Sequence, residues 1–216
     1  MCFSATASFV ASASLIATGY ATIKNTSTKE QVPFASIPIL FGVQQGIEGF
    51  VWLSLQQAEF QAIHNVTVYG FLFFAQVFWP FWVPFSIWLI EKNALRKKIL
   101  SVILFLGTIV AMYLAYCLVV FEPVASIHNH HIMYTLNFPA YFWWFSGLFY
   151  FVPTVLPPFF SSIKKMVWLG ILVFLSFLVS KLFFFEQLIS VWCFFAATMS
   201  VVVWYVLKKN PLKAIL

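Results

Sequence analysis

Seven long apolar stretches, separated by short connectors that carry nearly all of the charge, constrain this chain more than any other feature. Each stretch is close to the roughly 17–25 residues that an α-helix needs to cross the hydrocarbon core of a bilayer. Only 8% of the 216 residues are charged, which is too few to cover a surface that faces water. We therefore predict an all-α membrane protein whose single domain, residues 1–216, contains seven transmembrane helices. The predicted helices span residues 3–23, 32–56, 66–90, 100–120, 138–160, 166–185 and 187–206.

The basic residues predict how this bundle is oriented. Every Lys and Arg except Lys181 lies on alternate connectors or on the C-terminal tail. Because basic residues are retained on the cytoplasmic side, we expect the N-terminus outside and the C-terminus in the cytoplasm. The net charge of +6 follows from this topology and requires no nucleic acid as a partner. The expected partner is the lipid bilayer, and the expected location is the plasma (inner) membrane, as a multi-pass protein.

Glu48 is the only acidic residue within a predicted span, in a chain that contains no Asp. A charged residue at a helix centre costs about 2.5–3.5 kcal/mol on insertion scales, so it persists mostly where it faces the bundle interior, water or a partner. Helical spacing places Gln45, Glu48 and Trp52 on one stripe, and Gln76 of the third predicted helix lies at nearly the same depth. Two interpretations stay open. These residues form a binding site for a small molecule or ion, or Glu48 is a structural carboxyl hydrogen-bonded to Gln45 or Gln76.

Two glycines lie on the same predicted helix as Glu48. Gly42 and Gly46 are one helical turn apart and form a face of small residues. Such a face lets a second helix approach closely within a membrane, so we expect one to pack there.

Lys181 is the one basic residue near a predicted outer helix end. It could line the same site as the partner of Glu48, because both residues lie toward the outer side. The same position suits a Lys whose aliphatic stem lies in lipid while its ammonium reaches water at the interface. Both interpretations of Lys181 stay open.

The histidines all lie on the connectors that we expect to face outward. His64 is on the second connector, and His128, His130 and His131 are on the fourth, on the same side as the thiol of Cys2. Imidazole and thiolate groups are ligands for Zn or Cu, which makes a metal site one hypothesis. The alternative is that these histidines are merely solvated loop residues, since no second ligand pair stands at a fixed spacing.

Two motifs resemble an uncharacterised family of bacterial multi-pass membrane proteins. The first is the opening Met1-Cys2-Phe3-Ser4-Ala5, and the second is the QxxEGxVW pattern within residues 41–52. The resemblance implies that Cys2, Gln45, Glu48 and Trp52 are important for function. It implies no particular activity. Well-known seven-helix metal hydrolases fit badly, because this chain has no Asp and no His within a predicted span.

Three classes of function follow from these patterns. The first is a binding role, as a permease, sensor or small-molecule receptor, with an outward-facing polar site lined by Gln45, Glu48, Gln76 and Lys181. The second is a membrane enzyme that uses the Cys2 thiol. The third is a structural partner subunit. The residues alone leave open which class applies, which ligand is bound and how many copies assemble.

Overall fold

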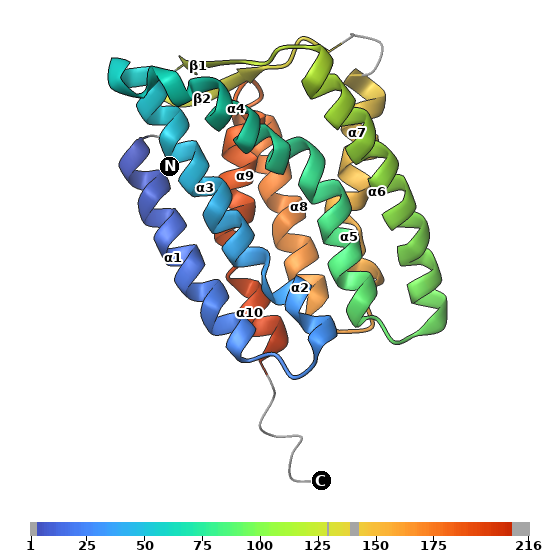
Figure 1. Cartoon of the computed structure of the whole chain (residues 1–216). Helices are drawn as coiled ribbons and strands as arrows, with labels where there is room; N and C mark the ends of the chain where they lie inside the picture. The colour runs from blue at the N-terminus through green and yellow to red at the C-terminus, as the bar shows by residue number, and fades with distance from the viewer. Residues whose placement is uncertain (1–3, 129, 139–142, 209–216) are drawn as a thin grey trace.

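The computed structural model describes residues 4–128, 130–138 and 143–208, and for residues 143–147 it describes the backbone alone. The described chain is a bundle of helices with one short hairpin across an end (Figure 1). The prediction of long apolar helices is confirmed. The helices are α1 (Ala5–Lys24), α2 (Val32–Ala35), α3 (Ile37–Gln56), α4 (His64–Leu72), α5 (Trp79–Ile90), α6 (Ala94–Val120), α7 (Trp143–Val155), α8 (Met166–Phe183), α9 (Leu188–Met199) and α10 (Val202–Leu207).

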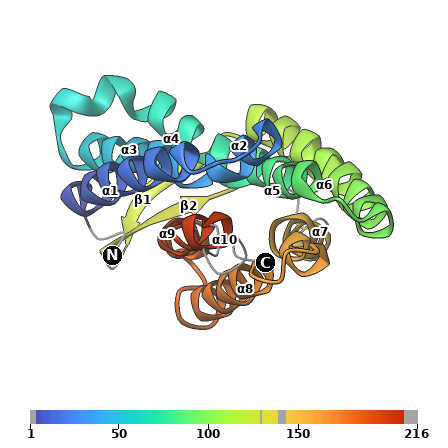
Figure 2. The ribbon, with the colours of Figure 1, turned by 90° about the horizontal axis from the view of Figure 1, so that it is seen from below.

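Seen along their axes, the helices form two layers (Figure 2). Helices α1, α3, α4, α5 and α6 form one layer, and α7, α8, α9 and α10 form the other. Within the described residues, six helical segments are long and apolar enough to cross a membrane. They are Ala5–Lys24, Lys29–Gln56, Ala58–Ile90, Ala94–Val120, Met166–Phe183 and Leu188–Leu207.

The fifth predicted span, residues 138–160, is the one outside this group of six. Its described part is α7 followed by a short 3-10 turn at Pro157–Phe160, while residues 139–142 lie outside the described residues. Helix α7 has 13 residues, fewer than a complete span requires.

Small residues bring α1 and α3 into close contact, as predicted from the glycines of α3. A Cβ atom added to Gly42 would lie 2.8 Å from Ile16 Cγ1 and 3.0 Å from the carbonyl oxygen of Ser12. A Cβ atom on Gly46 would lie 3.1 Å from Ser12 Oγ. Because these positions leave no room for a side chain, the two backbones can pack tightly and hold α3 near the middle of its layer.

Two of the predicted spans are interrupted near serine and proline residues. The second span is split at Ser36 into α2 and α3, one residue before the Ile37-Pro38 start of α3. The third span contains a π-helical segment, Phe73–Phe78, directly before Trp79 and Pro80 of α5. Proline removes a backbone donor, and the helix upstream of Pro80 has the wider hydrogen bonding of a π-helix. The Tyr150 hydroxyl donates to the carbonyl of the buried residue Ala75 within this segment.

The connector after α6 is a β-hairpin, a small addition to a fold that is otherwise all-α as predicted. Strands β1 (Val124–His128) and β2 (His131–Thr135) pair antiparallel, with Ile127 opposite Ile132. Ile132 is fully buried, and the Tyr134 ring stacks on Phe71 of α4 with 4.8 Å between centroids. The hairpin therefore packs over the end of the bundle rather than forming a solvated loop.

At the opposite end of the bundle, the Glu91 carboxylate links two connectors through hydrogen bonds. Its carboxylate accepts hydrogen bonds from the backbone N–H of Asn93 (2.8 Å) and from both the N–H and the hydroxyl of Ser162 (2.6 Å each). Burial raises the pKa of Glu91, but these hydrogen bonds outweigh it, so that the pKa lies below its usual value. The connector after α5 and the connector before α8 are thus held by one carboxylate.

Candidate functional site

Helix α3 carries the polar centre of the bundle. Gln44, Gln45 and Glu48 each have no exposed surface. The Ser190 hydroxyl of α9 donates to Glu48 Oε1 at 2.6 Å, and Gln45 Nε2 donates to Glu48 Oε2 at 3.2 Å. Both carboxylate oxygens thus have neutral hydrogen-bond partners, one from each layer of the bundle. The expected contact between Glu48 and Gln45 is present.

Gln44 extends this cluster toward α5. The indole N–H of Trp79 donates to Gln44 Oε1 at 2.7 Å. The Trp79 ring also stacks on Phe41, with 3.9 Å between centroids and 20° between planes. Gln44, Trp79 and Ser190 were not among the residues predicted for the site. Gln44 stands one turn before Glu48, and this spacing was the one signal in the sequence that pointed to it.

Several polar atoms in this cluster have unused hydrogen-bonding capacity. Within the described part of the chain, Gln45 Oε1 has no donor. Gln44 Nε2 has no acceptor there except the neighbouring Cys193 thiol, which is a weak one. Most buried polar atoms in folded proteins are paired, so these orphans are exceptional. They give the cluster both a donor and an acceptor for a polar group that is not part of this chain.

An apolar cavity lies between the two layers, next to the cluster. About 70 Å³ of it is open to the centre of a water molecule. Trp79 and Cys193 form part of its wall, and both residues contact the cluster through Gln44. Other lining residues include Phe41, Val83, Trp192 and Ala196. An apolar chamber with a few polar groups close to one side is the usual arrangement of a small-molecule site, and here those groups lie just behind Trp79 and Cys193.

The position of this cavity differs from the predicted one. Residues Phe34 and Ile37 at the start of α3 and Val203 of α10 line it, so it extends toward the end that bears most of the lysines. None of the four residues predicted to line an outward-facing polar cavity (Gln45, Glu48, Gln76 and Lys181) lines this one. The lining is apolar because the polar groups of α3 lie behind Trp79 and Cys193.

Lys181 and Gln76 do not join the cluster. Lys181 is exposed on α8, with its ammonium 5.7 Å from the centroid of the Phe177 ring. This is the geometry of a Lys that extends along an apolar surface, not of a counter-ion for Glu48. Gln76 is half-buried in the π-helical segment, and both oxygens of Glu48 are bonded to other residues.

Trp52 is on the same helix as the cluster but faces other neighbours. It is 1% exposed and packs in a second apolar group that includes Val51, Ile132 and Tyr134. This group joins α3 to the hairpin. Trp52 therefore packs against the hairpin and does not join the polar cluster.

The hypothesis of a metal site is not supported by the described residues, among which no three His, Cys, Asp or Glu side chains form a group suited to a metal ion. The histidines have separate neighbours instead. His64 Nδ1 lies 2.9 Å from Ser54 Oγ, and exposed His130 has a left-handed backbone with φ of 61°. Cys2, the proposed catalytic thiol and possible ligand, lies outside the described residues.

The two remaining histidines connect the hairpin to the turn between α8 and α9. His128 Nδ1 is 3.7 Å from Glu186 Oε2, and the His131 ring meets Phe184 edge-on at 5.2 Å. His128 and His131 are opposite each other in the hairpin. Burial lowers the pKa of His131, and the neighbouring His130 lowers it further.

A bundle of apolar helices that are long enough to cross a bilayer, with polar side chains buried at its centre, defines a helical membrane protein. The chain belongs to a family of unknown function, DUF6629, which matches residues 1–215. The resemblance to an uncharacterised family is confirmed at this level. No curated protein and no solved structure matches the chain.

Proposed function

We propose that this membrane protein binds a small, mainly apolar molecule in the cavity between its layers, with the Glu48 cluster recognising a polar group on that molecule. The single observation that carries this proposal is the shared wall formed by Trp79 and Cys193, which line the cavity and also contact Gln44, the neighbour of Glu48 in the buried cluster. An ionisable residue within a membrane bundle is expensive to insert, which favours a functional role. A permease, a sensor and a receptor would all use such a site.

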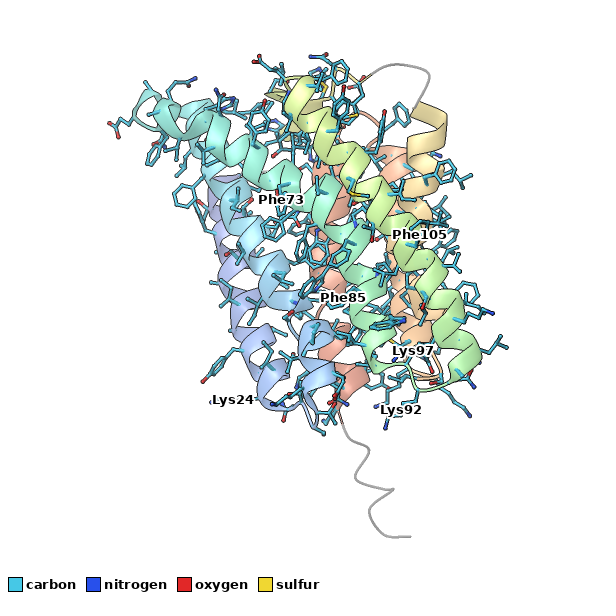
Figure 3. All side chains as sticks on the ribbon, turned by 45° about the vertical axis from the view of Figure 1, so that its right-hand side comes forward. Lys24, Phe73, Phe85, Lys92, Lys97 and Phe105 are labelled. Atoms are coloured by element: carbon cyan, nitrogen blue, oxygen red, sulfur yellow. The ribbon has the colours of Figure 1, made fainter. Side chains whose placement is uncertain are left out.

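The proposal includes the predicted topology of seven spans, with the N-terminus outside and the C-terminus in the cytoplasm of a plasma membrane. Helix α6 ends at the hairpin, while α8 begins at the opposite end of the bundle (Figure 1). The connection between them must return across the bundle, and α7 lies on this path. Lys24, Lys92 and Lys97 lie at the end away from the hairpin (Figure 3), which supports a cytoplasmic assignment for that end.

The experiment compares two probes that differ by one hydroxyl group, fluorobenzene and 4-fluorophenol. Their ¹⁹F NMR lines are recorded with the protein in lipid nanodiscs. We expect both lines to broaden with the parent protein, and the phenol to broaden more because its hydroxyl can reach the polar wall. Ala196→Phe fills the cavity and should abolish the broadening beyond that of empty nanodiscs.

Thr198→Phe is the matched control, because Thr198 is exposed on the same helix and does not line the cavity. This variant should behave like the parent. Equal broadening with the parent and with Ala196→Phe would reject the cavity as the binding site. An unchanged preference for the phenol in Glu48→Gln would reject the role given to the cluster.

A further inference from the structure

A second hollow lies at the lysine-bearing end of the bundle, between the last residues of α1 and of α10. We call it the basic recess, and it is lined by Lys24, Asn25, Thr26, Ser27, Trp204 and Lys208. About 510 Å³ of it is open to the centre of a water molecule. Among the described residues, its lining contains two ammonium groups and no carboxylate. The recess is separate from the cavity beside Glu48, with which it shares no lining residue.

Both lysines of the recess lie against aromatic rings. The Lys24 ammonium is 4.5 Å from the Tyr20 ring centroid, and the Lys208 ammonium is 4.7 Å from the Trp204 centroid. Aromatic residues concentrate at the interface between hydrocarbon and headgroups. Attraction between the ammonium group and the ring also restricts the conformations of each Lys side chain. The two cations are therefore held at headgroup depth.

The helix ends do not neutralise these cations. A helix C-terminus presents carbonyl groups with partial negative charge, which would attract a nearby ammonium. At the end of α1, the backbone N–H groups of Asn25 and Thr26 already bond the carbonyls of Thr22 and Ile23. At the end of α10, a third cation, Lys165, donates to the carbonyls of Tyr205 and Lys208 at 3.2 and 3.1 Å. Lys24 and Lys208 remain available to an external anion.

We propose that the basic recess binds the phosphate of an anionic phospholipid from the cytoplasmic leaflet. The lipid is favoured over free phosphate because the sides of α1 and α10 next to the recess expose large apolar residues. Tyr20 is 59% exposed, Val201 is 46% exposed and Tyr205 is 50% exposed. Such a surface suits the acyl chains of a lipid whose headgroup occupies the recess.

Native mass spectrometry of the full chain with phosphatidylglycerol and with phosphatidylcholine tests this assignment. We expect the parent protein to retain phosphatidylglycerol preferentially. The double variant Lys24→Gln, Lys208→Gln should bind it about thirtyfold more weakly, on the scale of two lysines near an anionic surface. A Lys24→Arg, Lys208→Arg variant keeps both charges and should retain most of the affinity, which separates charge loss from misfolding.

Lys181→Gln is the matched control, since it removes one exposed Lys at the other end of the bundle. It should leave phosphatidylglycerol binding unchanged, and an equal loss in this variant would overturn the recess as a specific site. Inorganic phosphate, added to protein in phosphatidylcholine nanodiscs, tests the other source of the anion. Strong displacement of phosphatidylglycerol by phosphate at equal concentration would overturn the lipid assignment in favour of a free anion.

Discussion

Glu48 is held by an amide and a hydroxyl rather than by a cation. Its oxygens accept hydrogen bonds from Gln45 and Ser190. Among the described residues, the contact between a basic and an acidic side chain is at the hairpin, between His128 and Glu186. Neutral donors satisfy a carboxyl group without fixing its charge. The side chain is therefore suited to respond to a polar group or a proton that arrives at the adjacent cavity wall.

We predict that Glu48→Gln affects function more than folding. A Gln at this position can accept from Ser190 through its oxygen and donate to Gln45 Oε1, an acceptor without a donor in the described chain, if the Gln45 amide turns over. The free energy of unfolding should fall by about 1 kcal/mol or less, the usual scale of one net hydrogen bond. Thermal unfolding in detergent measures this, and binding of 4-fluorophenol measures the functional loss.

Glu48→Ala is the harsher comparison, because it leaves a void and removes the acceptor of the buried Gln45 amide group. Each buried polar group left without a partner costs about 1–3 kcal/mol, so this variant should be clearly less stable than Glu48→Gln. If the two variants are equally destabilised, the hydrogen bonds to Glu48 do not contribute to the free energy of unfolding, and this prediction is wrong.

Local spacing was enough to predict part of this cluster but not all of it. Gln45 and Glu48 are three residues apart on one helix, so their contact follows from helical geometry alone. Ser190 is 142 residues from Glu48, and Trp79 is 35 residues from Gln44. Those contacts depend on which helices become neighbours, and apolar membrane helices carry little sequence information about their partners. For the same reason, the choice between two roles for Lys181 required the fold.

Among the elements, the apolar runs predicted where helices lie but not where they break. Ser36 splits the second span, and the last span is split at Ser200 and Val201 between α9 and α10. Hydropathy is averaged over many residues, so a one-residue break does not change it. The hairpin was missed because its strands are short and no Gly or Pro stands between them. His130, directly before β2, has a left-handed backbone that is unusual for a residue other than Gly.

Close contact between α5 and α6 predicts a large difference between two glycines. A Cβ atom on Gly107 of α6 would lie 2.1 Å from the backbone carbonyl oxygen of Pro80, whereas on Gly70 of α4 it would lie 3.5 Å from Ile47, an ordinary contact. Gly107→Ala should therefore lower the free energy of unfolding by about 1–3 kcal/mol or more. Gly70→Ala should be neutral or stabilising by up to about 1 kcal/mol, because Ala favours the helix.

Thermal unfolding of the two glycine variants, side by side in one detergent, measures this difference. Both changes add one methyl group to a helix interior, so intrinsic propensity cancels in the comparison. A Gly107→Ala protein as stable as Gly70→Ala would mean that α5 and α6 are farther apart than described.

The hairpin should loosen as the pH falls. Burial against Phe184 lowers the pKa of His131 below that of an unfolded His, which is about 6.5. The stability that neutral His131 contributes is present above that value and is lost as the pH falls through it toward the folded pKa.

Hydrogen exchange of the strand Val124–His128 and of its partner, corrected for the intrinsic effect of pH, measures this loosening. Protection should decrease from neutral pH to mildly acidic pH. His131→Phe should abolish the decrease, and His130→Gln, a change at an exposed neighbour, should preserve it. An unchanged pH dependence in His131→Phe would assign the effect to another group.

At the scale of the whole molecule, the labelled lysines and the hairpin lie at opposite ends. Lys24, Lys92 and Lys97 lie at one end, and β1 and β2 lie across the other (Figures 1 and 3). The cavity extends toward the lysine-bearing end, and Glu48 lies beyond its apolar part. If the proposed topology is right, the binding site is nearer to the cytoplasm than the sequence suggested.

We predict that His130→Cys, in a Cys2→Ser background, reacts with membrane-impermeant thiol reagents added to intact cells. Lys97→Cys should react only after the membrane is permeabilised, because positive residues are retained inside. Cys117 and Cys193 are buried and should contribute little labelling. A reporter fused after Leu216 should be active only in the cytoplasm. Labelling of Lys97→Cys in intact cells would reverse the orientation.

The π-helical segment Phe73–Phe78 acts as a phase adjustment within one long helix. On its outer side, Phe71 faces Tyr134 of the hairpin, and on its inner side, Trp79 faces Gln44. A regular α-helix turns by about 100° per residue, so removing one residue from this segment would rotate one half relative to the other by that angle. The two halves could then not satisfy both contacts at once. One extra residue therefore sets the register between the covered end of the bundle and its buried polar centre.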